Sequence, residues 1–446
     1  MINTIKQALT TREIRRKLEL MVFVIFITRV ISMIPVPGID ASVFKQWMAV
    51  NSNDALNLFS AFTGGSFENF SMFALGITPL ITAQIVVQLL GSVIPSLGKL
   101  QKRGEHGQKV TKRITNIVGI VLAIVQSCCM AIGFNKGGLI NGNGVACVIL
   151  ITTFMTAGTG IMMWLAHILD EKSIGNGVSI LLMANILSRM PGQFASLFKS
   201  LAKDKSTPIA SLSITAAILI FAAIIIVIIY MTEGYHPLHV QYSQKMSQSG
   251  EDAETGLIPV KVGISGVMPV IFASSLMAIP QLIAAIAGKG YGSGLSKIVL
   301  NMMSQKNWFD NDNPVYGLGL LIYLALIVFF AYFYLPITFN AAEVSDNIRR
   351  TGGFVPGVRA GEDTEQYIQY ISRRLTSIGV VMLICVTVIP IIICGALGLN
   401  STIGGTSLII VIGVITETVQ QIQLELARSE ERRVGKECRS RWSPYH

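Results

Sequence analysis

Residue types that perform chemistry are few in this chain and stand far apart. Among its five histidines, His236 and His239 are neighbours, and such a pair would hold a metal ion only with further soft ligands. No such ligands stand beside them, and the six cysteines show neither metal-ligand nor secreted-framework spacing. The phosphate-binding, zinc-protease and serine-hydrolase motifs (GxxxxGKS/T, HExxH and GxSxG) are absent from the sequence. We therefore expect no enzyme activity, no metal and no cofactor.

The composition explains this scarcity, because it is that of a membrane protein. Hydrophobic residues make up 51% of the 446 residues and charged residues 13%, whereas about 25% of a soluble domain is charged. The apolar stretches approach ~20 residues, the length of a helix that crosses a hydrocarbon core of ~30 Å. Buried strands of soluble proteins are apolar over only ~4–8 residues, so a large soluble α/β protein is excluded.

Ten apolar segments predict an all-α membrane protein with ten transmembrane helices. They span residues 18–34, 72–94, 114–134, 145–169, 177–198, 209–231, 262–287, 315–337, 375–397 and 403–423. The fifth segment is the weakest, because it contains Asn185, Arg189 and Pro191. The seventh is interrupted by Pro269 and Pro280. Such helices persist in a membrane only where neighbouring helices or a water-filled cavity satisfy the freed backbone groups.

Basic residues in the loops predict the orientation. They gather before the first segment, after the second and after the eighth, at Arg12, Arg15, Arg16, Lys17, Lys99, Lys102, Arg103, Lys109, Lys112, Arg113, Arg349, Arg350, Arg359, Arg373 and Arg374. Cytoplasmic loops carry the excess of Lys and Arg, so we expect these regions and both termini on the cytoplasmic side. The basic loop at 99–113 would also attract anionic lipids or ribosomal RNA phosphates by its charge.

Residues 54–72 are too few and too polar to span a membrane, yet they lead directly into the second apolar segment. Gly64 and Gly65 permit a sharp turn. Apolar surface comes from Phe59, Phe62, Phe67 and Phe70. A re-entrant element or short plug at about 59–71 fits this composition, and a soluble external loop with scattered aromatic residues is the alternative.

An ordered set of motifs covers nearly the whole chain as far as Ala427. The set is RVISMIPVPGID at 29–40, FALGITPLITAQIVVQLL at 73–90, GNGVSI at 175–180 and GGFVPGVRAGE at 352–362, with PVIFASSL within 257–280 and GGTSL at 404–408. In this order and spacing it resembles the SecY family, the channel subunits of the bacterial protein-export translocon. One such motif would be a weak signal, but the ordered set is specific.

The resemblance implies a channel of two halves, residues 1–200 and 201–427, related as inverted repeats of five spans each around a central hourglass pore. Such a channel passes unfolded secretory proteins across the cytoplasmic membrane and releases transmembrane segments sideways into lipid. It is passive, so a partner ATPase, translation or the membrane potential supplies the energy. The implied partners are the SecE and SecG subunits, the SecA ATPase, the ribosome and precursor proteins that carry signal sequences.

The resemblance also assigns a pore ring and a lateral gate by position. The ring comprises Ile77, Ile81, Val178, Leu182, Ile271 and Ile410, and the gate residues are Thr82, Gln88, Ser274 and Ser275. Branched aliphatic side chains form a dewetted constriction that blocks ions and yields around a polypeptide. The alternatives are ordinary: aliphatic residues of membrane helices usually face lipid or pack, and intramembrane polar groups often bond neighbouring helices.

The motif PGVRAG presents one fixed cation, Arg359, at a loop tip rich in glycine and proline. In the family, the corresponding arginine contacts the SecA motor or the ribosome. We expect Arg359 to make this contact together with Arg349, Arg350, Lys102 and Arg103. The alternative is an ordinary arginine of a cytoplasmic loop.

Two further classes of membrane protein compete with a channel. A secondary transporter of small solutes also uses inverted repeats and broken helices, but it needs ionisable residues at mid-membrane to couple ion and substrate. Here Arg29 stands near a span end, Arg189 lies in the weak fifth segment, and Glu417 lies late in the tenth. A scaffold or insertase subunit without a pore would not need the plug-like segment or the aliphatic ring.

The last residues, 428–446, differ in composition from the rest of the chain. Their sequence RSEERRVGKECRSRWSPYH resembles the translation of a sequencing-library adapter, and we expect it to be non-native. An authentic cytoplasmic tail is the alternative. Amplifying the gene from its source and reading past Ala427 decides between the two, because recovery of the same tail rejects the adapter.

Overall fold

The computed structural model describes residues 7, 10–37, 43–44, 46, 60, 62–101, 104–136, 144–202, 207–242, 255–263, 266–286, 295–303, 308, 314–359, 361–396 and 405–441. The chain divides into two compact units. Unit 1 comprises Met1–Ala195, Ala278–Leu300 and Val414–His446, and unit 2 comprises Ser196–Met277 and Asn301–Gly413.

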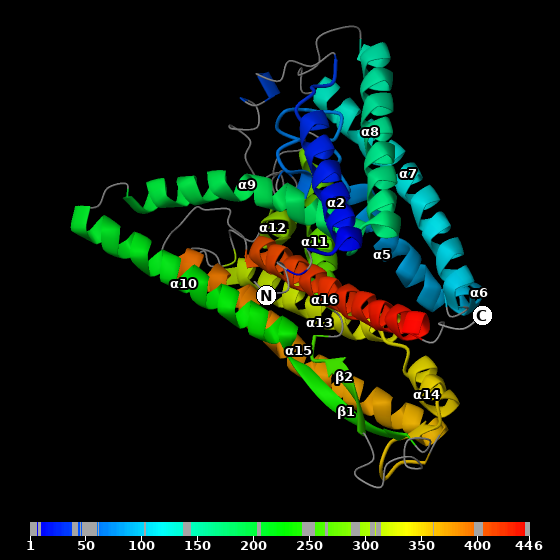
Figure 1. Ribbon diagram of the computed structural model, residues 1–446. Coiled ribbons are helices and arrows are strands. Elements are labelled where there is room, and N and C mark those ends of the chain that lie inside the picture. The colour runs from blue at the N-terminus through cyan, green and yellow to red at the C-terminus, as the bar shows by residue number, and fades with distance from the viewer. Residues whose placement is uncertain are drawn as a thin grey trace. The chain divides into compact units, whose positions relative to one another are not determined.

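A helix coincides with each of the predicted apolar segments (Figure 1). In chain order these helices are α2 (Arg12–Ile31), α5 (Thr78–Val93), α7 (Gly104–Lys136), α8 (Gly144–Lys172), α9 (Gly177–Ala202), α10 (Thr207–Glu233), α11 (Met268–Ile286), α13 (Gly317–Thr338), α15 (Glu362–Ala396) and α16 (Gly405–Arg441). Between them lie α6 (Pro95–Gln101), α12 (Leu295–Met303), η3 (Pro314–Tyr316) and α14 (Ala341–Arg350). The predicted helical membrane fold is thus confirmed.

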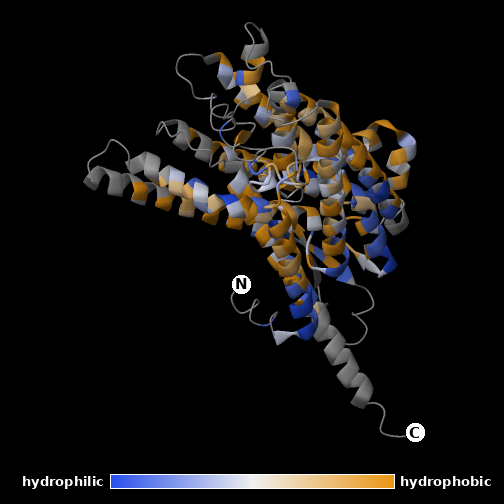
Figure 2. Cartoon of the chain, turned by 90° about the horizontal axis from the view of Figure 1, so that it is seen from above, coloured by the Kyte–Doolittle hydropathy of each residue, from blue (hydrophilic) through white to orange (hydrophobic). Residues whose placement is uncertain are grey.

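The helices carry the apolar surface that a bilayer requires. Within the described residues, 5 helices reach the length and hydropathy of a membrane span, and they lie in α7, α8, α13, α15 and α16. Figure 2 shows hydrophobic residues along the helices and hydrophilic residues toward helix ends. Large apolar side chains point outward, such as Phe26 of α2 at 64% exposure and Leu321 of α13 at 61%. Soluble proteins rarely expose such surface over wide areas, whereas lipid covers it without cost.

Proline sets the start of α11. The helix begins at Met268, so Pro269 stands in its first turn, where a missing N–H costs nothing. The predicted interruption at Pro269 is therefore wrong, since this residue starts the helix. Pro280 does lie inside α11, as Pro191 lies inside α9 and Pro336 inside α13.

In unit 1, α5 packs against α7, α7 against α8, and α2 against α8. Glycine permits one very close approach in this packing. A Cβ placed on Gly158 of α8 would overlap the carbonyl oxygen of Met72, which belongs to the chain entering α5. The backbone before α5 therefore lies directly on α8.

The GNGVSI motif forms the start of α9. The carboxylate of Asp170 accepts a hydrogen bond from the Gly177 N–H at 2.7 Å, and Asn176 Oδ1 accepts one from the Val178 N–H at 3.1 Å. These side chains satisfy backbone donors that have no partner within the helix. Lys112 of α7 bonds the other oxygen of Asp170 at 3.2 Å. The motif thus fixes where the fifth apolar helix begins.

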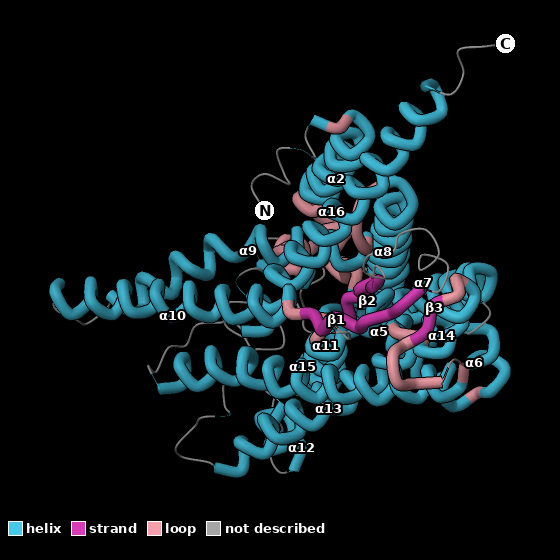
Figure 3. Tube along the Cα trace, turned by 60° about the horizontal axis from the view of Figure 1, so that its bottom comes forward, coloured by secondary structure: helices cyan, strands magenta, loops and turns pink. Residues whose placement is uncertain are grey.

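A small sheet in unit 2 adds to the predicted all-α fold. Strands β1 (Tyr235–Tyr242), β2 (Thr255–Lys261) and β3 (Gly353–Phe354) pair antiparallel in the order β2-β1-β3 (Figure 3). Gln241 of β1 lies opposite Thr255 on one side and Phe354 on the other. The sheet shares a buried cluster with α14 and α15, formed by Leu238, Val240, Val260, Ile348, Val355, Ile368 and Leu375.

Candidate functional site

The segment before α5 is a compact series of turns, and we call Ser60 and residues 62–71 the plug segment. The Gly65 N–H donates to the Ser60 carbonyl at 3.0 Å, and the Ser71 N–H donates to the Ser66 carbonyl at 2.9 Å. Gly64 has φ +64° and Gly65 has φ +86°, in the left-handed region that favours glycine. The two glycines thus reverse the chain direction.

The plug segment is joined by backbone hydrogen bonds to the chain that follows α2. The Val36 N–H donates to the Phe70 carbonyl at 2.9 Å, and the Met72 N–H donates to the Ile34 carbonyl at 3.4 Å. Because these bonds flank a short antiparallel bridge between Pro35 and Ser71, one end of the segment is held in register by the backbone.

Aromatic side chains bury the apolar side of the plug segment. Phe67 and Phe70 are buried, and both form edge-to-face pairs with Phe44, at ring distances of 5.4 and 5.1 Å. Phe134 of α7 completes the group, 5.5 Å from Phe70. Each such pair contributes about 0.5–1.5 kcal/mol beyond its buried area. Phe62 is also buried, and burial of the three phenylalanines counts against a soluble external loop with scattered aromatic residues. The predicted plug residue Phe59 lies outside the described residues.

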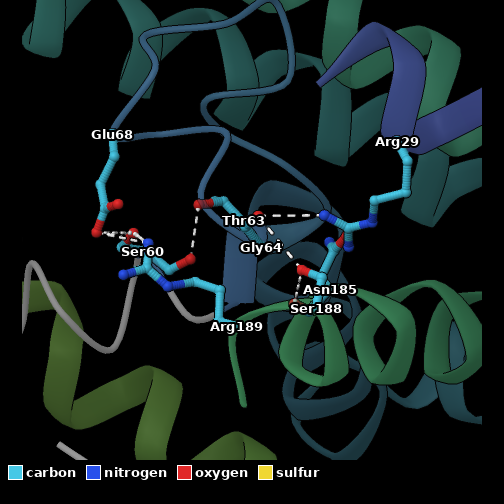
Figure 4. A network of polar contacts seen from close by, with 8 residues as sticks. All are labelled: Arg29, Ser60, Thr63, Gly64, Glu68, Asn185, Ser188 and Arg189. Carbon is cyan, nitrogen blue, oxygen red and sulfur yellow. Dashed lines mark hydrogen bonds and ion pairs between the residues drawn. The ribbon is translucent and has the colours of Figure 1, made fainter. Parts of the chain in front are cut away.

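Arg29, near the end of α2, joins the plug segment to α9 (Figure 4). Its Nη1 donates to the Gly64 carbonyl at 3.1 Å, and its Nη2 donates to the Ala184 carbonyl at 2.9 Å and to Asn185 Oδ1 at 2.6 Å. Asn185 in turn donates from Nδ2 to the Phe62 carbonyl at 2.9 Å. One guanidinium and one amide therefore bond two backbone carbonyls of the plug segment.

Arg189, one turn further along α9, makes a second attachment. Its Nη1 lies 2.5 Å from Glu68 Oε1 and 2.5 Å from Ser60 Oγ, and Ser60 Oγ donates to Glu68 Oε1 at 3.1 Å. The side chains of Arg189 and Glu68 are 23% and 33% exposed. This ion pair is thus partly shielded from solvent, unlike a surface pair.

The six predicted ring residues are all buried. Ile77, Ile81, Val178 and Leu182 belong to unit 1, and Ile271 and Ile410 to unit 2. Burial counts against the lipid-facing alternative, because lipid-facing residues of the same helices are exposed. Ordinary packing remains the alternative to a ring.

The four predicted gate residues differ in how their polar atoms are satisfied. Thr82 donates to the Thr78 carbonyl of its own helix at 3.0 Å, and Ser274 of α11 bonds Tyr323 Oη of α13 at 3.1 Å. Within the described residues, Gln88 Oε1 and Ser275 Oγ are buried without a hydrogen-bond partner. A buried unpaired oxygen costs about 1–3 kcal/mol of stability. Hydrogen bonding between neighbouring helices therefore does not account for these two oxygens.

The predicted partner-binding arginines lie at the surface of unit 2. Arg349 and Arg350 are exposed at the end of α14, and Arg359 is exposed in the turn before α15. Gly357 has φ +82°, and the Arg359 carbonyl accepts the Thr364 hydroxyl at 2.8 Å, so the turn is fixed at both sides. Lys102 and Arg103 lie outside the described residues.

The histidine pair does not form a site. His236 and His239 both lie on β1, and residues an odd number of positions apart on a strand project to opposite faces. Their imidazoles therefore cannot share one metal ion.

The helices, the turn-built segment before α5 and the exposed basic turn define a multi-spanning membrane protein with the fold of protein-conducting channels. A solved structure described as a protein conducting channel matches with a TM-score of 0.68, 16% identity and 91% coverage of both chains. Another, of a SecY protein whose plug domain is said to stabilise the closed state and maintain a membrane seal, matches with TM-score 0.65, 16% identity and 91% coverage of both chains. Sec61 of a canine ribosome-channel complex gives TM-score 0.65, 17% identity and 91% coverage of both chains.

Sequence comparison defines the family. The SecY family profile matches residues 71–419. A protein translocase subunit SecY of Staphylococcus epidermidis is 33% identical over 442 residues, covering 98% of this chain and 100% of that protein. A Staphylococcus aureus relative with the same description is 32% identical over 446 residues, covering 98% and 100%. The chain therefore belongs to the SecY family.

Sequence reasoning missed the partners of the polar residues in the fifth apolar segment. Asn185 and Arg189 marked that segment as weak, and the signal that would have found their role is the coincidence of polar side chains one turn apart on an otherwise apolar helix. Tyr323, which bonds the predicted gate residue Ser274, was also missed.

Proposed function

We propose that this chain is the central channel subunit of a Sec translocon. It passes unfolded secretory proteins across the cytoplasmic membrane and releases transmembrane segments sideways into lipid. The observation that carries this proposal is the likeness to protein translocase subunits over 98% of the chain. The buried plug segment gives additional support, because a channel that passes whole polypeptides must be sealed when idle.

In this function, the chain is divided at about residue 200 into two halves around the pore, with both termini cytoplasmic. The dry collar is formed by six branched aliphatic residues, Ile77, Ile81, Val178, Leu182, Ile271 and Ile410. Their burial supports this role, since a collar side chain cannot face lipid. A collar of branched aliphatic groups excludes ions and yields around a passing chain.

The channel is passive and receives its energy from outside. SecA or the translating ribosome drives the polypeptide, and the exposed turn that carries Arg359 is the contact we assign to them. SecE and SecG complete the translocon, and anionic lipids attract the basic loop at 99–113. A structural relative is described within a ribosome-channel complex, which supports the ribosome as a partner.

A secondary transporter is not favoured by the charged groups. Arg29 and Arg189 bond the plug segment within unit 1, whereas ion-coupled transport needs ionisable groups free to bind ion and substrate.

Depletion of the protein tests the function. We expect uncleaved secretory precursors to accumulate, and the chain ending at Ala427, supplied from a plasmid, to clear them. Normal precursor processing together with lost uptake of one solute would instead favour a transporter.

Replacing Gln88 by leucine is expected to stabilise the closed gate. The substitution removes an oxygen that is buried without a hydrogen-bond partner among the described residues, which costs about 1–3 kcal/mol. Export of a reporter with a weakened signal sequence should fall several-fold, while export with a strong signal sequence changes less. Thr159→Val in α8 is the control, because the buried Thr159 hydroxyl is satisfied within its own helix and the residue has no assigned role in the gate. Equal effects of the two substitutions would count against a gate role for Gln88.

A further inference from the structure

We propose that Arg29, Asn185 and Arg189 form a two-point polar latch that holds the plug segment in its resting position and releases it when the segment shifts relative to α9. The first point joins Arg29 and Asn185 to the carbonyls of Gly64 and Phe62. The second joins Arg189 to Glu68 and Ser60. The latch is the regulatory part of the proposed channel, since it acts on the segment that seals it.

The first point is built to release. Arg29 Nη2 is bound to α9 through the Ala184 carbonyl and Asn185 Oδ1, independently of the plug segment. Of the guanidinium nitrogens, Nη1 bonds the Gly64 carbonyl, which Ser188 Oγ of α9 also approaches at 3.5 Å. Departure of the plug segment therefore breaks one bond of the guanidinium and leaves the cation held by α9. Such a preorganised cation can bind the segment again without first being reassembled.

Glycine at position 64 is required for this contact. Its φ of +64° is unfavourable for residues with a side chain. A Cβ there would also lie 2.6 Å from Arg29 Nη1. The backbone carbonyl reaches the guanidinium only because nothing projects between them.

The second point is an ion pair between the plug segment and α9. Glu68 Oε1 pairs with Arg189 Nη1 and accepts a hydrogen bond from the Ser60 hydroxyl. The carboxylate therefore also links Ser60 to the later part of the plug segment. With side chains 23% and 33% exposed, the pair is partly shielded from solvent and still reachable by water when it opens.

One helix face carries both points. Asn185 and Arg189 are four residues apart on α9, which places them on the same side of the helix. Any rotation or shift of this face relative to the plug segment loosens both points together. The polar residues that weaken the fifth apolar segment thus have a shared partner, and coordinated release follows from their spacing.

Charge exchange across the second point tests the latch. The plug position is read from the alkylation rate of Ser66→Cys by a small maleimide, in resting membranes and in a chain whose native cysteines are replaced by alanine. Ser66 is buried in the plug segment, so alkylation requires the segment to move. We expect Glu68→Arg and Arg189→Glu each to raise the rate about threefold or more, and the double variant to return to within about twofold of the parent rate.

The ion pair between Lys17 and Glu425, at 2.6 Å, provides a matched control. It joins α2 to α16 without touching the plug segment, so Glu425→Lys should leave the alkylation rate at the parent value. Unchanged rates in both single variants, or a double variant as reactive as the singles, would overturn the latch.

The same strains separate the latch from the channel function. If the parent chain clears accumulated precursors but charge exchange leaves Ser66→Cys unreactive, only the latch is wrong. If the parent chain fails to clear precursors, the proposed function fails whatever the alkylation rates are.

Discussion

A chain that carries Arg359→Glu is expected to reach the membrane in normal amount and to export precursors at least about tenfold more slowly. Arg359 is exposed, and its turn is fixed by Gly357 and by the bond from Thr364. The substitution therefore changes the charge presented to a partner and leaves the fold intact. Losing one member of a buried charge pair at an interface costs about 2–5 kcal/mol, which corresponds to more than a tenfold effect.

Arg373→Glu is the matched control for this prediction. Arg373 is exposed on α15, and it is not among the residues assigned to the motor or the ribosome. The Arg373→Glu chain should therefore export precursors at the parent rate despite the same change of charge. Pulse-chase processing of a secretory precursor measures both variants. Normal processing in Arg359→Glu would remove this arginine from the partner contact.

Replacing Gly158 by alanine is expected to destabilise unit 1. The added Cβ would overlap the Met72 carbonyl oxygen. That oxygen cannot move freely, because the Met72 N–H is bonded to Ile34 and the adjacent Ser71 is paired with Pro35. Forced overpacking of this kind costs about 1–3 kcal/mol and occasionally more.

Gly160→Ala, two residues further along α8, is the control. A Cβ there meets nothing within 4 Å, so the substitution should be neutral or stabilising by up to ~1 kcal/mol from helix propensity. Thermal denaturation of the purified protein in detergent compares the two variants. Equal melting temperatures would show that α8 and the chain before α5 do not pack as closely as described.

The long apolar runs made the ten helices predictable, because ~20 apolar residues have few other uses. The glycine pair and the aromatic residues before α5 marked a turn in a stretch too polar to span, and the structure has that turn with buried aromatic side chains. Its role as a plug stays a prediction. The sheet of unit 2 was not predicted. Its strands have 8, 7 and 2 residues. So short an alternation of apolar residues is a much weaker pattern than the apolar runs of ~20 residues that mark the spans.

The contacts of the plug segment could not have been predicted from spacing. Arg29 is separated from Gly64 by 35 positions and from Asn185 by 156, so no local pattern joins them. Sequence reasoning identified each as unusual, as a charged residue near a span end, a turn glycine and a polar residue in a weak span. Only the fold shows that the three are one site.

A trapped substrate tests the central claim most directly. A secretory precursor stalled in mid-export should cross-link to cysteines placed at Ile81, Ile271 and Ile410. These three positions lie on three different helices, α5, α11 and α16. It should not cross-link to a cysteine at Leu321, whose side chain is 61% exposed on α13. Cross-links at Leu321 equal to those at the three aliphatic positions, or none at those positions, would contradict a polypeptide path through a central collar.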